Sequence, residues 1–220
     1  MRSAEFWEFY DTVRAALEHR AHTFARMFEY LDRLDRPVGI IETGCVRAVG
    51  NWRGDGGSTV LFDKYAQTHP GSVVHTVDID AKATELCRSL VSSQVTVHTA
   101  DSVRFLETAA DALQPDSQAL DLLYLDSFDL DKANPLPSAL HHLMELTAST
   151  PLIRAETMVV VDDSFLTVQG IAGPNAQFRL VAEPTIDGKG KLIAEYARRI
   201  GAELVFQGYQ CGWIRMRGPR

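Results

Sequence analysis

The stretch IIETGCVRAVGNWRGDGGSTVLF, residues 40–62, has the form of a strand, a glycine-rich loop and a helix. It opens with an apolar run and closes with the spacing of a helix that begins at Ser58. The glycines that precede this helix are Gly54, Gly56 and Gly57. Free N–H groups at a helix start favour an anionic ligand, although the spacing fits neither a P-loop nor GxGxxG. The stretch predicts a β/α unit with a ligand-binding loop; a long connection closed by ordinary turns is the alternative.

The same alternation continues along the chain. Short apolar runs predict strands at 38–44, 72–80, 95–101, 120–126 and 157–163. Helical spacing predicts helices at 58–68, 82–92, 102–113, 138–149 and 190–200. Residues 202–216 are typical of two strands, of which the last must run antiparallel. The pattern predicts an α/β, doubly wound Rossmann-like sheet of seven strands, mostly parallel with an antiparallel C-terminal strand.

Two parts of the chain differ in pattern. Residues 1–37 are predicted to form an N-terminal helical segment, with Ser3 as a helix cap and Pro37 at its end. Residues 38–220 form the α/β domain. The aromatic N-terminal helices are expected to cover a substrate or to make the contact of a homodimer, although aromatic residues at helical spacing are more often core.

Composition excludes several classes of protein. The 220 residues carry a net charge of −7, which argues against nucleic acid as a partner. The three cysteines form no zinc-ligand pattern and indicate a reducing compartment. The charged N-terminus is unlike a signal peptide, and no apolar run has membrane-spanning length. We therefore expect a cytoplasmic protein with no membrane partner.

Acidic residues gather where the predicted strands end. They are Glu42, Asp78, Asp80, Asp101, Asp126, Asp162 and Asp163. In doubly wound sheets, ligands bind beyond the carboxyl ends of the strands. The pattern predicts one acidic site along this edge, and the alternative is that each acid caps the helix that follows it.

Three of these positions suggest a nucleoside site. An acid after the second strand can accept both ribose hydroxyls, and Asp78 is preferred to Asp80 because it directly follows the apolar run. Asp101 and Ser102, after the third strand, are placed to reach an adenine edge. The glycine loop, the ribose acid and the base-edge residues follow one another in that order.

With these motifs the chain resembles the class I S-adenosylmethionine-dependent methyltransferases. ETGC…GDGGST resembles their first motif, TVDID the ribose acid, TADS the adenine-side motif, LLYLDSFD the fourth motif and MVVVDD the motif after the fifth strand. The resemblance implies that Glu42 and Gly44 approach the methionine part of the cofactor and that Ser58 binds its carboxylate. Cys45 and Gly57 are also predicted to contact the cofactor. The loop at 45–56 is longer than the usual turn, so Arg47, Trp52, Arg53 or Asp55 is expected to have an added role.

Asp126, Asp162 and Asp163 are predicted to meet at the ends of the fourth and fifth strands. Three carboxylates repel one another unless a cation neutralises them, and oxygen ligands suit Mg²⁺, with Mn²⁺ or Ca²⁺ as rivals. The pattern resembles metal-dependent O-methyltransferases of the catechol and macrocin type. The resemblance implies that the metal binds the substrate oxygen beside the methyl group.

The general base is left open by the sequence. Asp129, three residues beyond Asp126, is one candidate, with Asp131 and Lys132 as neighbours; catechol-type members have a lysine at this offset. Asp126 and His141 are the other predicted catalytic residues. His141 and His142 are adjacent on a helix, so only one of them can face the site.

The prediction is a methyltransferase, with divalent metal, acting on the hydroxyl of a small natural product such as a sugar, polyketide or phenol. Residues 162–175 are expected to form a lid. The alternatives are a metal-independent methyltransferase of the same fold and a non-catalytic nucleoside-binding partner protein. A dehydrogenase is disfavoured because GxGxxG is missing.

Overall fold

A seven-stranded sheet forms the centre of the protein, in the order β10-β11-β5-β4-β1-β2-β3. The computed structural model describes residues 3–54, 57–112, 119–173, 177–180 and 182–217. The parallel strands are β1 (Gly39–Thr43), β2 (Val73–Asp78), β3 (Val95–Thr99), β4 (Leu120–Leu125) and β5 (Met158–Val161). β11 (Cys211–Ile214) runs antiparallel to both β5 and β10 (Glu203–Phe206). The predicted α/β fold, with its antiparallel strand near the C-terminus, is confirmed.

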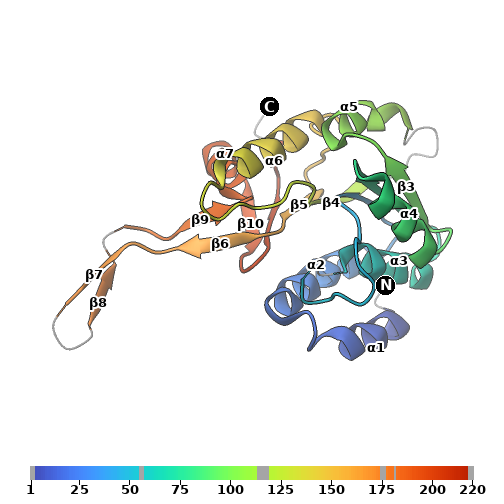
Figure 1. Ribbon diagram of the computed structural model, residues 1–220, viewed down its shortest axis with the longest axis horizontal. Coiled ribbons are helices and arrows are strands. Elements are labelled where there is room, and N and C mark those ends of the chain that lie inside the picture. The colour runs from blue at the N-terminus through green and yellow to red at the C-terminus, as the bar shows by residue number, and fades with distance from the viewer. Residues whose placement is uncertain (1–2, 55–56, 113–118, 174–176, 181, 218–220) are drawn as a thin grey trace.

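Helices cover both faces of this sheet (Figure 1). One face carries α1 (Ala4–Val13), α2 (Ala21–Arg33), α3 (Ser58–Thr68) and α4 (Ala81–Leu90). The other face carries α5 (Ser102–Ala112), α6 (Leu136–Ala148) and α7 (Lys191–Ile200). α6 begins before the predicted Ser138, because Pro137 is tolerated in the first turn of a helix.

The apolar runs of the central strands supply both cores. In β4, Leu122 and Tyr124 pack on the side of α1–α3, whereas Leu123 and Leu125 pack on the side of α5–α7. Successive strand residues point to opposite faces, so a strand covered on both faces needs apolar residues at nearly every position. This requirement explains why the strands were recognisable from the sequence.

The acid inside β4, Asp121, is neutralised locally. Its side chain is 2% exposed, accepts two hydrogen bonds from Arg36 at 2.6 and 2.8 Å, and accepts a third from the backbone N–H of Gly39 at 3.0 Å. The contacts fix the start of β1 beside β4. Asp121 therefore has a structural role away from the carboxyl edge of the sheet.

The N-terminal helices share a core with the sheet. Ser3 caps α1 as predicted, accepting from the backbone N–H of Phe6. Phe6 and Phe28 are fully buried in the cluster that also contains Ile40 and Tyr124. These aromatic side chains are core residues and are not displayed for a partner. A short 3-10 helix, η1 (Glu18–Arg20), leads from α1 toward α2.

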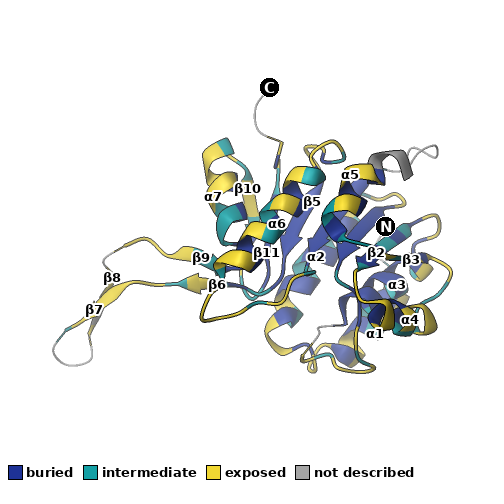
Figure 2. Cartoon of the chain, turned by 45° about the horizontal axis from the view of Figure 1, so that its top comes forward, coloured by how far each residue is buried: buried dark blue, intermediate teal, exposed yellow. Residues whose placement is uncertain are grey.

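The segment after β5 forms an arm, which sequence reasoning interpreted as a lid loop. β6 (Ser164–Thr167) pairs with β9 (Thr185–Gly188), and β7 (Gly170–Ala172) pairs with β8 (Phe178–Leu180), both antiparallel. The arm extends away from the body of the protein, and it is largely exposed (Figures 1 and 2). The predicted lid at 162–175 is thus one side of a hairpin, apart from 174–175, which lie outside the described residues. The strands have only three or four residues each, too few to show a period in the sequence.

Within the part of the chain that the structure describes, no helix is both long and apolar enough to cross a membrane.

Candidate active site

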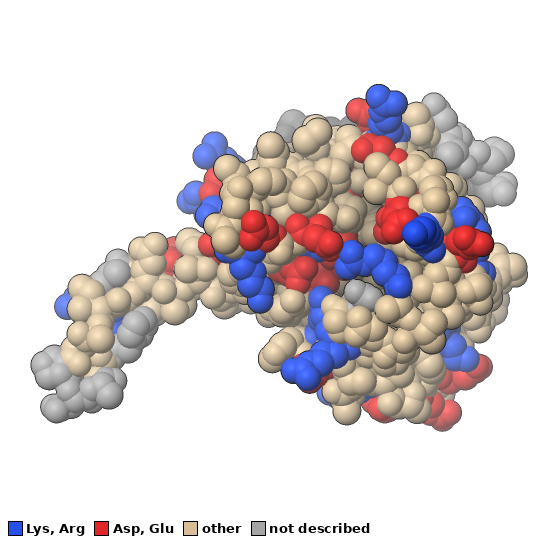
Figure 3. Space-filling view, in the orientation of Figure 1, with Lys and Arg blue, Asp and Glu red and all other residues tan. Residues whose placement is uncertain are grey.

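Two adjoining pockets lie at the carboxyl edge of the sheet. The smaller, which we call the polar pocket, has a volume of about 50 Å³. Its lining residues are Arg20, Gly44, Cys45, Arg47, Gly54, Ser58, Asp78, Asp126, Ser127, Asp129, Asp163 and Lys189. Many of the residues predicted for a cofactor and for catalysis therefore meet in one place. In Figure 3 acidic atoms gather near the middle of the molecular face, with basic atoms beside them.

Gly44 brings β1 and β4 together at the floor of this pocket. Its φ is +80°, and a Cβ added there would lie 2.5 Å from the carbonyl oxygen of Asp126. Only glycine combines this conformation with so close an approach. Gly57, also with positive φ, stands directly before α3, where a Cβ would meet the ring of Trp52 at 2.6 Å. Both predicted glycines are thus needed for the shape of the loop.

Glu42 is fully buried and binds protein groups. Its carboxylate accepts from the hydroxyls of Ser58 at 2.5 Å and of Thr59 and Thr76, each at 2.7 Å. Burial raises the pKa of Glu42 to about 7, although the three hydroxyls oppose the shift. Glu42 ties α3 to the sheet, and the Ser58 hydroxyl is used in that contact. Ser58 also lines the polar pocket, and the cofactor contacts that the resemblance implies for this pair stay a prediction.

Asp78 lines the polar pocket, as expected of the preferred ribose acid. Its oxygens accept from the backbone N–H groups of Cys45 at 3.2 Å and Asp80 at 2.8 Å. Asp80 instead caps α4 by accepting from the N–H of Lys82. The choice of Asp78 over Asp80 agrees with these positions, while the capping alternative holds for Asp80.

The predicted adenine-side residues have partners in the protein. Asp101 caps α5, accepting from the N–H of Arg104 at 2.9 Å. The Ser102 hydroxyl contacts His141 Nε2 at 3.1 Å. His141 also lies 3.4 Å from Glu145 and is absent from the described lining of the polar pocket. Its predicted catalytic role therefore finds no support in its contacts.

His142 is the packing histidine of the adjacent pair. It is fully buried, and Nδ1 contacts the carbonyl of Ser138 at 2.7 Å. Burial lowers the pKa of His142 to about 4. Among the described residues, its Nε2 and Glu145 Oε2 have no hydrogen-bond partner, and these atoms are 4.0 Å apart.

The three predicted metal ligands do meet. Asp126, Asp162 and Asp163 each offer an oxygen within 4.8 Å of the others, and we call this set the acidic cluster. Asp162 has no exposed surface, and Asp163 has a φ of +44°. The ends of β4 and β5 lie side by side because Leu125 pairs with Val161. Strand adjacency was therefore a sound basis for this prediction.

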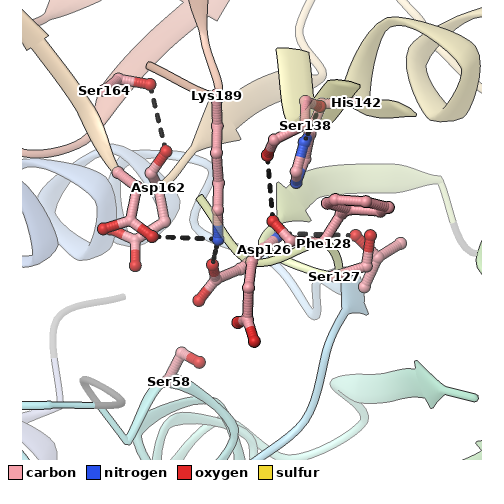
Figure 4. Close-up of polar contacts among 12 residues, drawn as sticks. Ser58, Asp126, Ser127, Phe128, Ser138, His142, Asp162, Ser164 and Lys189 are labelled. Atoms are coloured by element: carbon pink, nitrogen blue, oxygen red, sulfur yellow. Dashed lines mark hydrogen bonds and ion pairs between the residues drawn. The ribbon is translucent and has the colours of Figure 1, made fainter. Parts of the chain in front are cut away.

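Two basic side chains already occupy the acidic cluster. The ammonium group of Lys189, from the turn between β9 and α7, contacts Asp126 and lies 3.0 Å from Asp163 (Figure 4). Arg20, at the end of η1, donates to both oxygens of Asp162 at 3.0 and 3.2 Å. Lys189 is 2% exposed, and the guanidinium of Arg20 also stacks on Tyr209. Neither cation was predicted from the sequence.

The pKa values follow from this arrangement. Burial would lower the pKa of Lys189, but Asp126 and Asp163 outweigh it and raise the pKa above its ordinary value. Burial would raise the pKa of Asp163, but Lys189 and the Tyr209 hydroxyl lower it. Lys189 therefore stays protonated and Asp163 ionised.

The three carboxylates have the chemistry of a Mg²⁺ site, but basic side chains of the protein already bind their oxygens. Hard carboxylate oxygens suit Mg²⁺, Mn²⁺ or Ca²⁺. Here Asp162 is bound on both oxygens by Arg20, and Lys189 stands between Asp126 and Asp163. A divalent ion bound by Asp126 and Asp163 together would compete with Lys189 for these oxygens.

Asp129 lies at the mouth of the polar pocket. It pairs with Arg47 at 3.1 Å, and its side chain is 78% exposed. Both residues line the pocket, which in this state is too small for a nucleoside. A ligand of that size therefore requires more space than these residues leave in the structure. Of the residues expected to have a role in the 45–56 loop, Asp55 lies outside the described part of the chain, as does Gly56, and Arg53 pairs with Glu18.

The larger cavity, which we call the large pocket, has a volume of about 730 Å³ and lies beside the base of the arm. It is lined by His19, His22, Thr23, Leu130, Lys132, Asp163, Phe165, Leu166, Gly208 and Tyr209. Asp163 belongs to both pockets. The two spaces therefore meet at the acidic cluster.

Sequence reasoning missed Lys189, Arg20 and Tyr209 because each comes from a segment with no motif. Arg20 is 142 residues from Asp162. The one available indication was the pair of basic residues in the GKGK run, 188–191, directly before a predicted helix.

Comparison with known proteins gives no relative. No family model matches the chain, and no curated protein matches it in sequence.

Proposed function

We propose that this chain transfers the methyl group of S-adenosylmethionine to a hydroxyl of a small molecule. The observation that carries the proposal is the meeting of the polar pocket and the large pocket at Asp163. Group transfer needs two ligands held with their reacting atoms a few ångströms apart. The sheet also has its antiparallel strand β11 beside β5, which is the arrangement that the sequence resemblance implies.

The residues of the polar pocket have properties suited to the cofactor. Gly44 and Cys45 offer close backbone approach, and Asp78 offers carboxylate oxygens for the ribose. S-Adenosylmethionine, when bound, supplies an activated methyl group next to a positive sulfur. The protein has to position the acceptor oxygen and to take up its proton.

The large pocket has properties suited to the acceptor. Tyr209 and Phe165 give it aromatic walls, and Asp163 lies at its inner end. Asp163 is ionised and faces both ligands, so it is the proposed proton acceptor. Asp129 remains the second candidate because it lines the polar pocket.

The contacts of Lys189 and Arg20 favour the metal-independent form of this reaction. The metal-dependent form, with Mg²⁺ held by Asp126, Asp162 and Asp163, stays a prediction from the resemblance. Methyl transfer that continues unchanged in excess chelator supports the first form, whereas loss of transfer supports the second.

Calorimetric titration with S-adenosylhomocysteine tests the cofactor assignment. We expect binding in the micromolar range, and at least tenfold weaker binding to Asp78→Asn. Asp80→Asn is the matched control, because Asp80 is two residues away and caps α4. Absence of binding to the unmodified protein would remove the methyltransferase proposal.

Labelled methyl transfer to a panel of phenols, sugars and polyketides then tests the reaction. Asp163→Asn is expected to lower kcat about 100-fold or more, a larger change than its effect on the affinity for S-adenosylhomocysteine. Asp129→Asn should lower kcat by less than tenfold. The reverse order would assign the base to Asp129.

A further inference from the structure

We propose that Lys189 takes the place of a divalent cation in the acidic cluster, so that the chain carries its own fixed positive charge there. The inference concerns the cluster itself and holds whether or not the chain transfers methyl groups. It goes against the metal site that the sequence resemblance implies.

The position of Lys189 is the first support. Its ammonium group contacts Asp126 and Asp163, which end two adjacent strands, and its side chain has only 2% of its surface exposed (Figure 4). Burial of a long, flexible charged side chain costs conformational entropy and desolvation, and the two carboxylates offset this cost. The ammonium lies between two carboxylates of the same cluster that would otherwise hold a metal.

The backbone around Lys189 is built for this position. Gly188 has a φ of +76°, and a Cβ there would overlap the carbonyl oxygen of Asp163. The backbone N–H of Lys189 donates to that same carbonyl at 3.2 Å. On the other side, a Cβ at Gly190 would overlap the hydroxyl of Ser164. The chain thus approaches Asp163 as closely as glycine allows, and Lys189 is held at the cluster from both ends.

Charge balance is the second support. Burial raises the pKa of Asp126 well above its ordinary value, and the ammonium group of Lys189 opposes that shift. With all three carboxylates ionised, Lys189 and Arg20 leave the cluster with a net charge of −1, and loss of Lys189 makes it −2, which is the charge that a divalent cation neutralises. Arg20 also lies 3.8 Å from Asp163, but its closer contacts are with Asp162, the carbonyl of Arg53 and the ring of Tyr209, whereas Lys189 contacts Asp126.

The proposal predicts that a variant without the ammonium group gains affinity for a metal ion. Removal of the ammonium group should open the cluster to metal, so Lys189→Met should bind Mn²⁺ at least tenfold more tightly than the unmodified protein. Lys191→Met is the matched control, because Lys191 lies two residues away, is 41% exposed and pairs with Asp187. Lys191→Met should bind Mn²⁺ no better than the unmodified protein.

The test is titration with Mn²⁺ alone, in which binding is measured by calorimetry and by the electron paramagnetic resonance signal of free Mn²⁺. A second variant, Lys189→Met with Asp126→Asn, should lose the gained affinity, which assigns the ion to the cluster. The proposal is overturned if the unmodified protein binds one Mn²⁺ tightly and Asp126→Asn abolishes that binding. It is overturned equally if Lys189→Met gains no affinity.

Melting of the unmodified protein keeps the proposal testable if Lys189→Met does not fold. With Lys189 in place, millimolar Mn²⁺ should leave Tm unchanged within about 1 °C, since nothing binds the native state preferentially. A rise of several degrees that Asp126→Asn removes would show that metal displaces Lys189. This readout needs no cofactor, so its failure is separate from failure to bind S-adenosylhomocysteine.

Discussion

At the scale of single residues, Glu42 occupies a position of the first motif and is bound by hydroxyl groups of the protein. Its place near the carboxyl end of β1 suggests a ligand role, yet its oxygens accept hydrogen bonds from hydroxyls of the protein. The consequence is a buried acid whose pKa is about 7, well above its ordinary value of 4.5. Glu42 therefore gives the protein a pH-dependent stability in the neutral range.

The sign of this dependence follows from proton binding. The folded protein holds the proton on Glu42 between pH 4.5 and 7, while the unfolded chain releases it. The contribution to stability is thus full at low pH and is lost as pH rises through 7. Between pH 5 and 8 the loss should be about 2.5 kcal/mol.

Urea unfolding of the unmodified protein and of Glu42→Gln measures this effect. Glutamine keeps the shape of the side chain and has no titrating proton. The free energy of unfolding of the unmodified protein, relative to that of Glu42→Gln, should therefore fall by about 2.5 kcal/mol from pH 5 to 8. Other titrating groups cancel in the difference. Parallel pH curves for the two proteins would contradict the assignment.

Asp121 allows a second prediction at this scale. Asp121→Asn replaces one Arg36 contact with an N–H group facing the guanidinium, within a 2% exposed site. Because Arg36 is itself 43% exposed, we expect a cost of about 2 kcal/mol, less than for a fully buried pair. Chemical denaturation measures it, with Glu203→Gln at the exposed pair with Arg215 as the control, expected within about 0.5 kcal/mol. Equal effects of the two substitutions would contradict the structural role of Asp121.

At the scale of elements, the arm and its base are the part that the sequence left unpredicted. The parallel strands were predictable because burial on both faces requires unbroken apolar runs, as in β4. The arm has no such requirement, since β7 is exposed, β6 and β9 are only partly buried, and these strands pair only within the arm. Local sequence carries little information about a ladder of three residues.

The turn at the arm base gives a prediction for backbone geometry. Gly188→Ala would combine a positive φ with a clash against the Asp163 carbonyl, whereas Gly201→Ala at the end of α7 has a similar φ of +72° and open space around it. We expect about 1 kcal/mol for Gly201→Ala from the left-handed conformation alone. Gly188→Ala should cost at least 2 kcal/mol more, because the backbone must move.

Thermal or urea unfolding of both glycine variants checks the difference. Gly188→Ala should also disturb Lys189 and Asp163, so it should change the binding of Mn²⁺ relative to Gly201→Ala. Similar stabilities for the two variants would show that the arm base adapts without strain.

At the scale of the whole molecule, the N-terminal helices and the sheet form one structure. Phe28 packs on Phe6, Tyr10 and Tyr65 with its ring fully buried. Sequence periodicity predicted the helices, but it did not show that their aromatic faces complete the core of the α/β domain. That information lies in contacts between segments far apart in the chain.

Phe28→Ala tests this unity. Loss of a buried phenylalanine should cost 3–5 kcal/mol, within the range for large core deletions. Leu140→Ala, at a half-exposed position on α6, is the control and should change stability by less than about 1 kcal/mol. Fluorescence and circular dichroism should report one shared transition, and two separate transitions would mean that the N-terminal helices unfold on their own.

The same scale explains what could be foreseen of the site. The acidic cluster followed from strand adjacency, because Asp126 and Asp162 end neighbouring parallel strands. The cations that neutralise it come from the 3-10 helix η1 and from the turn at the base of the arm. No spacing rule connects those segments, so only the folded chain shows that they meet.

The pairing of Arg20 with Asp162 has a kinetic consequence. These residues are separated by 142 positions, and Lys189 joins the cluster from still further along the chain. Contacts between such distant segments close large loops and form slowly. Until they form, the carboxylates at the end of the sheet repel one another without relief. We therefore expect the acidic cluster to be completed late in folding, and a chain that lacks η1 or the arm to be destabilised by repulsion among these carboxylates.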